Sequence, residues 1–293
     1  MVEAWKPLVY YIRGRILSIF SFVVPKDDKM IIFISTPDFS DNPRYLYEEA
    51  KKKLKDYKFV WIVDRANMFN KISLKENTIF VERGSFQLLK YLLRAKYIVA
   101  SHGVPYWKSR NQIMILLWHG LPIKGIGETS VKIKVPKTNV LYWFRKSLSM
   151  TDYFVTTSKF SWLIFLSEKF ISGKTKAIFC GQPRCDALFQ SKEQSVKTLS
   201  KIIKINVKKY DQIVLYLPTF RDYNSTITRK IIENLTINKD LIDFLDHNNV
   251  LFLIKPHPLD KALSCAQFEL HELTNFRFLK NEDLLNNFLT LYD

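Results

Sequence analysis

The sequence has few cysteines, and their spacing fits neither a disulfide framework nor a zinc site. There are three among 293 residues: Cys180, Cys185 and Cys265. An odd and low count cannot form a regular set of bridges, and the first two lack the nearby Cys or His ligands of a zinc site. We expect three ordinary thiols in a reducing, cytoplasmic setting.

Acidic residues are scarce relative to basic ones. The chain has 28 Asp and Glu against 45 Lys and Arg, so its formal net charge is +17. Such an excess predicts an anionic partner, which can be a nucleic acid, an anionic lipid surface or a phosphorylated substrate. The apolar fraction of 47% argues against wholesale disorder, and the length suits about two domains at roughly 100–200 residues each.

No uninterrupted apolar run near the amino terminus reaches the roughly 18–20 residues of a membrane span. Arg13 and Arg15 interrupt the aromatic first segment, which also lacks a cleavage site. One stripe at helical spacing holds Ile12, Ile16, Ile19, Phe20 and Val23. We predict that residues 1–25 form an amphipathic segment on a membrane surface. A first helix packed on the protein's own core and a degenerate signal anchor are the alternatives.

Short apolar runs alternate with helix-like stretches along the rest of the chain. The runs cover residues 30–35, 59–64, 78–82, 96–101, 113–118, 153–158, 177–181, 213–220 and 250–258. This alternation predicts an α/β fold whose parallel sheets are covered on both faces. Helices are expected around 227–247 and 281–289. A polar stretch at 190–212 predicts a boundary between a domain at 26–190 and a second at 191–293. Because the second has few strands, we expect it to be truncated.

Three of these runs end in polar or titratable residues. They end in His119-Gly120, in Pro218 to Asp222, and in Pro256-His257-Pro258. Ligands of open α/β sheets bind outside the carboxyl ends of the strands, so these ends predict a site. Four further cations on strand-end loops suggest an anion cleft: Lys124, Arg184, Arg221 and Lys255.

Each member of this set has a structural alternative. A lone histidine at a strand end is often only a packed structural residue, and His102 in "ASHGVP" is read that way. Arg221 and Asp222 can form a turn ion pair, and Gly120 can serve only a tight turn.

Five motifs in order resemble one enzyme family. "WHGLPIKGIG" at 118–127 looks like the Trp-His-Gly-Thr-Pro-Leu-Lys motif of the CDP-glycerol glycerophosphotransferase family, the primases and polymerases of teichoic acid synthesis. The other four are "FSDNPRYLYE" (39–48), "GQPRCDAL" (181–188), "LYLPTFRD" (215–222) and "LIKPHP" (253–258). Leu121 and Cys185 depart from the family's Thr and Asn, and its Thr-Asp-Tyr-Ser-Ser motif is not found.

The resemblance implies a GT-B fold of two Rossmann-like lobes facing a cleft, and transfer of glycerol phosphate from CDP-glycerol to a hydroxyl of a membrane-linked acceptor with release of CMP. It implies His119 as the base that deprotonates the acceptor, a task suited to an imidazole whose ordinary pKa is about 6.5. It assigns His257 to the departing phosphate. The implied donor-binding residues are Leu117, Trp118, Gly120, Leu121, Arg184, Pro218, Thr219, Arg221, Lys255 and Pro256. The implied acceptor-side residues are Asp41, Asn42 and Lys124.

The sequence has no Asp-x-Asp pair, so we expect no metal and no cofactor beyond the CDP-linked donor. The expected partners are a CDP-polyol, a polyprenyl-linked acceptor and an anionic membrane surface, and the expected location is peripheral, on the cytoplasmic face of the cell membrane. CDP-ribitol or another CDP-polyol is an alternative donor. A non-catalytic membrane-binding or acceptor-binding fragment is a second alternative. A nucleic-acid binder is a third, although no recognised nucleic-acid module is present.

Overall fold

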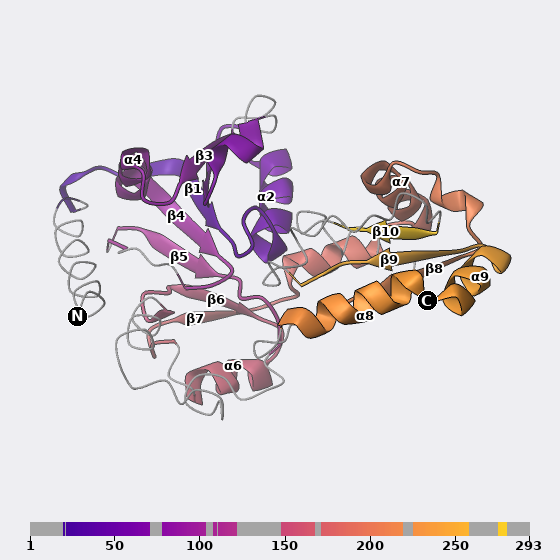
Figure 1. The fold of residues 1–293 in the computed structure, drawn as a ribbon. Coiled ribbons are helices and arrows are strands. Elements are labelled where there is room, and N and C mark those ends of the chain that lie inside the picture. Colours follow the sequence, from indigo (N-terminus) through magenta and orange to yellow (C-terminus); the bar gives the residue numbers. More distant parts are fainter. Residues whose placement is uncertain are drawn as a thin grey trace, which may run out of the picture. The chain divides into compact units, whose positions relative to one another are not determined.

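The computed structural model describes residues 20, 22–70, 78–103, 108–109, 111–121, 148–167, 171–218, 225–257 and 275–279. The chain divides into two compact units, Met1–Arg184 and Cys185–Asp293. The boundary predicted from the polar stretch lies after residue 190, six residues later. Each unit has its own sheet and its own core (Figure 1).

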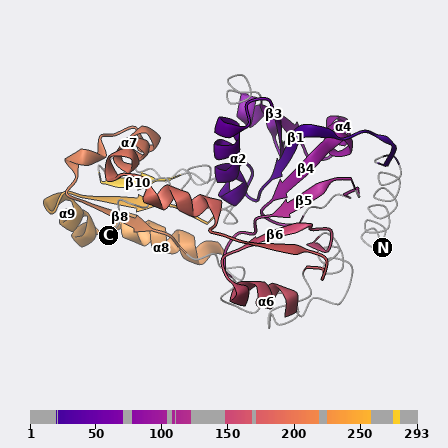
Figure 2. The same ribbon diagram turned by 180° about the vertical axis from the view of Figure 1, so that it is seen from behind.

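The first unit is built on a seven-stranded parallel sheet. Its strands run in the order β3-β2-β1-β4-β5-β6-β7, and Figures 1 and 2 show the sheet from opposite sides. The strands are β1 (Asp27–Ile34), β2 (Lys58–Val63), β3 (Thr78–Glu82), β4 (Ala95–Ala100), β5 (Ile113–Leu116), β6 (Tyr153–Thr156) and β7 (Lys176–Phe179). The described helices are α2 (Asp41–Lys53), the 3₁₀ turn η1 (Ala66–Phe69), α4 (Phe86–Arg94) and α6 (Lys159–Ser167). The predicted α/β class is confirmed.

The inner strands of this sheet are largely apolar because both of their faces are buried. In β1, Ile32 and Ile34 pack in one core cluster while Ile31 and Phe33 pack in the other. Helix α2 buries Tyr47 on the second face, and α4 buries Leu88, Tyr91 and Leu92 on the first. An alternating polar pattern would have been expected from a sheet with one wet face.

The strand order creates a switch point between β1 and β4. Both strands are parallel neighbours, but the chain leaves β1 toward β2 on one side and reaches β4 on the other. In such sheets the crevice for a ligand forms outside the carboxyl ends of the strands at this point. The loops after β1, β4 and β5 gather there.

The second unit contains a three-stranded parallel sheet in the order β10-β9-β8. Its elements are α7 (Lys192–Ile203), η4 (Val207–Lys209), β8 (Gln212–Tyr216), α8 (Ser225–Ile237), α9 (Lys239–His247), β9 (Val250–Ile254) and β10 (Phe276–Phe278), and the 3₁₀ segment η3 (Pro183–Phe189) leads into it. The central strand β9 is buried on both faces, against Leu199 on one side and against Ile232 and Leu245 on the other.

The single helix predicted around 227–247 is wrong. The structure has two helices, because Asn238 begins α9 by accepting a hydrogen bond from the Leu241 backbone N–H at 3.0 Å. An N-terminal cap of this kind stabilises a new helix start and so competes with continuation of the old helix. The helix expected at 281–289 lies outside the described residues.

None of the described helices is both long and apolar enough to cross a membrane. Most of the predicted amphipathic segment 1–25 lies outside the described residues. Within the part that is described, Phe20, Phe22 and Val23 expose 60%, 72% and 77% of their surface.

Candidate active site

Four loops at the carboxyl edge of the first sheet bring their polar residues together. They follow β1, β4, β5 and β7 respectively. The residues that meet are Asp41, Asn42, Ser101, His102, Trp118, His119, Gly120, Gln182 and Arg184. Five of them belong to the set that the sequence resemblance assigned to acceptor and donor binding, and His119 is the assigned base.

The loop between β1 and α2 is fixed to its neighbouring strand ends. The Asp38 carboxylate accepts a hydrogen bond from Arg83 Nη2 at 2.9 Å and another from the Asp64 backbone N–H at 2.5 Å. The Ser35 hydroxyl accepts from the Ser40 backbone N–H at 3.0 Å. These bonds tie the loop to the ends of β2 and β3, so the start of α2 has one defined position.

Asn42 links three distant parts of the chain. Its Nδ2 donates to the Trp118 carbonyl at 2.9 Å, and its Oδ1 accepts from the Arg184 backbone N–H at 3.2 Å. The side chain is fully buried. A buried carboxamide with partners on both ends holds those partners in place, since unmaking either bond leaves a buried polar group unsatisfied. The structure thus places Asn42 beneath the site, where it sets the backbone around Trp118 and Arg184.

Trp118 turns the chain at the end of β5. Its φ is +57°, a left-handed conformation that is unfavourable for a bulky residue. The ring is buried and meets Phe165 edge-on with centroids 4.9 Å apart. This packing and the bond from Asn42 hold the strained turn, which ends the strand two residues earlier than predicted and directs His119 away from the sheet.

His119 is oriented by a backbone hydrogen bond. Its Nδ1 lies 3.3 Å from the Ser101 carbonyl oxygen, which can only accept, so Nδ1 carries the proton in the neutral ring. Nε2 therefore holds the lone pair. This is the arrangement of a histidine general base, in which one ring nitrogen is anchored and the other accepts a proton.

A second histidine stacks on the first. The rings of His102 and His119 are 4.0 Å apart and 5° from parallel, and the Trp118 ring stacks on His119 at 4.3 Å. The Ser101 hydroxyl lies 2.9 Å from Nδ1 of His102. His119 is thus held by rings and by a hydrogen bond, and its position is defined more tightly than that of a solvent-exposed side chain.

Burial keeps both imidazoles neutral. Burial, and to a smaller extent the proximity of His119, lowers the pKa of His102 from 6.5 to about 4. Burial also lowers the pKa of His119 below its ordinary value. The Ser101 carbonyl and the Asp41 carboxylate act against this shift, while Arg184 adds to it. A base that is already unprotonated near neutral pH can accept the proton of an attacking hydroxyl.

Arg184 places a positive charge beside this base. Its Nη1 pairs with Asp41 Oδ1 at 2.8 Å, and the Arg184 side chain as a whole remains 30% exposed. A Cβ at Gly120 would lie 3.6 Å from Nη2, so the guanidinium lies beside the backbone that follows His119. A guanidinium suits phosphate oxygens because its fork of N–H donors matches their geometry. The edge therefore combines an imidazole that can accept a proton with a guanidinium whose geometry suits phosphate oxygens.

The remaining predicted residues fall in other places. The Leu117 side chain is buried in the core, and Leu121 is 55% exposed. In the second unit, the loops after β8 and β9 carry Pro218, Lys255, Pro256 and His257, with Lys255 and His257 half-buried. The Lys255 backbone N–H donates to the Tyr216 carbonyl at 3.1 Å, which fixes the start of its loop. Lys124, Thr219 and Arg221 lie outside the described residues.

Sequence reasoning missed three members of the site: Ser101, His102 and Gln182. Gln182 lies 3.5 Å from Asn42 Nδ2. A signal for His102 existed, because "SHG" follows β4 just as "WHG" follows β5, and the two strands are neighbours. Among the described residues, no group of three or more His, Cys, Asp and Glu side chains could hold a metal ion. The expectation of a metal-free reaction stays a prediction.

Comparisons with known proteins give one consistent picture. The family model for CDP-Glycerol:Poly(glycerophosphate) glycerophosphotransferase matches residues 16–289. The chain is 29% identical over 262 residues to a teichoic acid poly(glycerol phosphate) polymerase of Bacillus spizizenii, which covers 86% of this chain and 64% of that protein. It is 26% identical over 219 residues to a teichoic acid glycerol-phosphate transferase of Staphylococcus aureus, covering 72% of this chain and 55% of that protein.

Solved structures of the wall teichoic acid polymerase TagF share the fold. One of them, from a crystal soaked with CDPG, aligns with a TM-score of 0.72 at 19% identity over 99% of this chain and 72% of that chain. Another aligns with a TM-score of 0.73 at 20% identity. The α/β architecture of the two units is therefore of the GT-B type. The chain spans less than two thirds of the length of the two curated relatives described above.

Proposed function

Because this chain belongs to the CDP-glycerol:poly(glycerophosphate) glycerophosphotransferase family, we propose that it transfers glycerol phosphate from CDP-glycerol to a hydroxyl group of a membrane-linked acceptor and releases CMP. Family membership confirms the resemblance read from the motifs. The observation that carries the proposal is the His119 ring, whose Nδ1 is anchored on the Ser101 carbonyl so that Nε2 holds a lone pair.

In the proposed reaction the acceptor oxygen attacks the β-phosphorus of CDP-glycerol. A new O–P bond forms, the P–O bond to CMP breaks, and the hydroxyl proton moves to Nε2 of His119. General-base help of this kind contributes about 10²–10⁴-fold to a rate. The electron pair of the broken bond stays on the CMP phosphate, whose growing negative charge needs preset cationic partners.

Arg184 is the first of these partners, since its guanidinium lies on the same edge as His119 and is partly exposed. As the family motif implies, Lys255 and His257 are proposed as further partners of the departing phosphate. The reaction is proposed to need no metal, because these cations would neutralise the charge instead.

We further propose that the protein works as a peripheral protein on the cytoplasmic face of the cell membrane, with a polyprenyl-linked acceptor. The net charge of +17 and the exposed Phe20, Phe22 and Val23 support this location. Deletion of residues 1–24 should release the protein from membranes, as measured by sedimentation. Persistent binding would show that another surface holds it there.

CMP release with a panel of CDP-polyols tests the activity. We expect the wild-type protein to turn over CDP-glycerol. His119→Ala should abolish this turnover, and His257→Ala should weaken binding of the donor. Faster turnover of CDP-ribitol would favour the alternative donor. If the protein still binds membranes but releases no CMP with any donor and acceptor, the non-catalytic alternative is favoured.

A further inference from the structure

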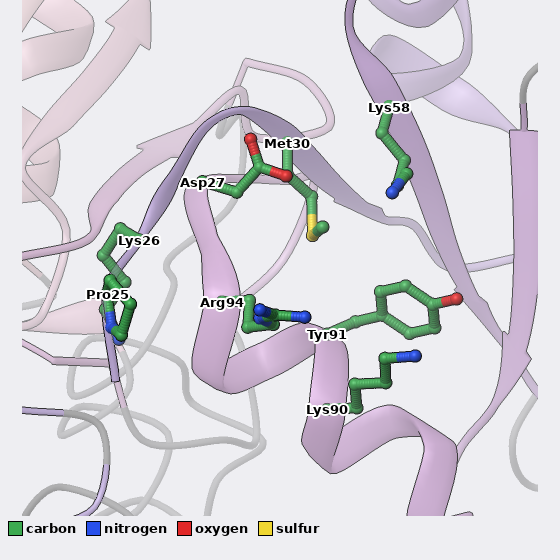
Figure 3. Close-up of a pocket in the computed structure, with 8 residues that line it drawn as sticks. All are labelled: Pro25, Lys26, Asp27, Met30, Lys58, Lys90, Tyr91 and Arg94. Carbon is green, nitrogen blue, oxygen red and sulfur yellow. The ribbon is translucent and has the colours of Figure 1, made fainter. Parts of the chain in front are cut away.

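A basic pocket lies at the edge of the first sheet opposite the candidate active site. It has a volume of about 330 Å³ and is formed by the chain before β1, the start of β2 and the last turns of α4. The strands are all parallel, so the amino ends of β1 and β2 that border this pocket face away from the edge that carries His119. Figure 3 shows the pocket and its lining side chains.

Positive charge dominates the pocket. Four cations line it, Lys26, Lys58, Lys90 and Arg94, against one carboxylate, Asp27. In the part of the chain that the structure describes, the side chains of Lys58, Lys90 and Arg94 have no carboxylate partner. Figure 3 shows the ends of Lys58 and Arg94 directed toward the space around the Tyr91 ring. Unneutralised cations that converge on one space favour an anion there.

The carbonyl end of α4 also borders the pocket, and by itself it would repel an anion. Two side chains cover those carbonyls. The Lys26 ammonium donates to the Leu93 carbonyl, and Gln112 Nε2 donates to the Leu92 carbonyl at 2.6 Å. The negative end of the helix is therefore already satisfied, and the field in the pocket remains positive.

Exposed apolar side chains lie near the pocket-lining residues in the sequence. Phe22 and Val23, just before it in the chain, expose 72% and 77% of their surface. On α4 itself, Phe86 is 95% exposed and Leu89 is 37% exposed. Cations beside exposed aromatic and aliphatic groups are typical of surfaces that bind the membrane interface, where the apolar groups enter the acyl boundary. A site for a soluble anion needs no such apolar rim.

We propose that this pocket binds the phosphodiester head group of an anionic membrane lipid, while Phe22, Val23 and Phe86 enter the bilayer surface. The inference rests on the proposed membrane location and goes beyond it by naming a discrete lipid site. It does not depend on the proposed chemistry, because the experiment below measures binding rather than turnover.

The test is co-sedimentation of the full chain with vesicles of phosphatidylcholine, with and without phosphatidylglycerol. The pocket variant is Lys58→Gln/Lys90→Gln/Arg94→Gln. The control, Arg65→Gln/Lys159→Gln/Lys197→Gln, removes the same charges from exposed positions elsewhere. Partition to phosphatidylglycerol vesicles should fall on the order of 100-fold in the pocket variant and by no more than a few-fold in the control. Equal losses in the two variants would overturn the proposal in favour of diffuse attraction.

A second pair of variants tests the apolar rim. Phe86→Ser should weaken vesicle binding, while Phe160→Ser, on α6 and 71% exposed, should not. If soluble polyphosphate binds the wild type but not the pocket variant, and Phe86→Ser leaves vesicle binding unchanged, the pocket is a polyanion site and the lipid proposal is wrong. Thermal melting of each variant confirms folding, and CMP release in detergent should be unchanged in the pocket variant.

Discussion

The two edges of the first sheet use polar residues in opposite ways. At the carboxyl edge, Asn42 and His119 are buried or half-buried, and each has a defined hydrogen-bond partner. At the amino edge, Lys90 and Arg94 are exposed and Lys58 is half-buried, and none of the three has a carboxylate partner among the described residues. Bond making requires reacting atoms held in one place, whereas the proposed lipid site requires several cations within reach of one head group. Single substitutions should therefore have large effects at the first edge and partial effects at the second.

The largest effect is expected at the proposed base. His119→Gln should lower kcat by about 10²–10⁴-fold, since the proton acceptor is lost while a side chain of similar polarity remains. Single-turnover CMP release measures the change, and a melting curve checks the fold. Wild-type turnover in this variant would show that His119 is not the base and that the carboxyl edge is no more sensitive to substitution than the amino edge.

The next largest effect is expected at Asn42, the buried side chain that bonds Trp118 and Arg184. Asn42→Ala should reduce the free energy of unfolding by roughly 2–4 kcal/mol, because it leaves the Trp118 carbonyl and the Arg184 N–H without this partner. Asn70→Ala, at an exposed position, should cost less than about 0.5 kcal/mol. Urea denaturation of both variants provides the measurement. Similar costs in the two would mean that Asn42 is not a structural link.

A smaller effect follows from the stacked imidazoles. The pKa of folded His102 is about 4 and its ordinary value is 6.5, so the folded protein binds fewer protons than the unfolded chain between these values. Stability is therefore full above pH 6.5 and falls as the pH drops toward 4, by at most roughly 3 kcal/mol from this residue.

His102→Phe retains a ring against His119 but does not titrate, so its unfolding free energy should depend less on pH in this window. His102→Gln also removes the titration but loses the stacked ring, so it should in addition lower kcat. Urea denaturation at several pH values measures the lost titration in both variants, and the rate of CMP release separates the two. An unchanged pH dependence in both variants would contradict the assignment.

The smallest effect is expected at Asp41. Its carboxylate raises the pKa of His119, so Asp41→Asn should lower that pKa and move the acid limb of the kcat/KM profile to lower pH, by less than about one unit. Asp38→Asn, in the same loop but bonded to Arg83, serves as a control that should leave the limb in place. A shift toward higher pH in Asp41→Asn would show that the loss of the ion pair with Arg184 outweighs the direct effect.

Local sequence patterns predicted the strands of the first sheet because periodicity and burial on both faces are local signals. They failed at Asn238, where apolar spacing continues across a helix boundary that the cap determines. The motif resemblance singled out His119, Asn42 and Arg184, which the structure brings to one edge of the sheet. It could not reveal that His102 stacks on His119, or that Asn42 bonds the residue at 184, since both contacts depend on how separate strands lie side by side.

The bond between Asn42 and Arg184 spans 142 positions of the chain. During synthesis, a polypeptide that has emerged only through β6 contains the paired histidines but lacks both the backbone donor and the guanidinium that complete the edge. Contacts of such long range form late, after the intervening segments have ordered. The chain must therefore be synthesised as far as Arg184 before the first unit can bind an anion beside His119. A chain that ends before Arg184 should form the sheet but lack the complete site.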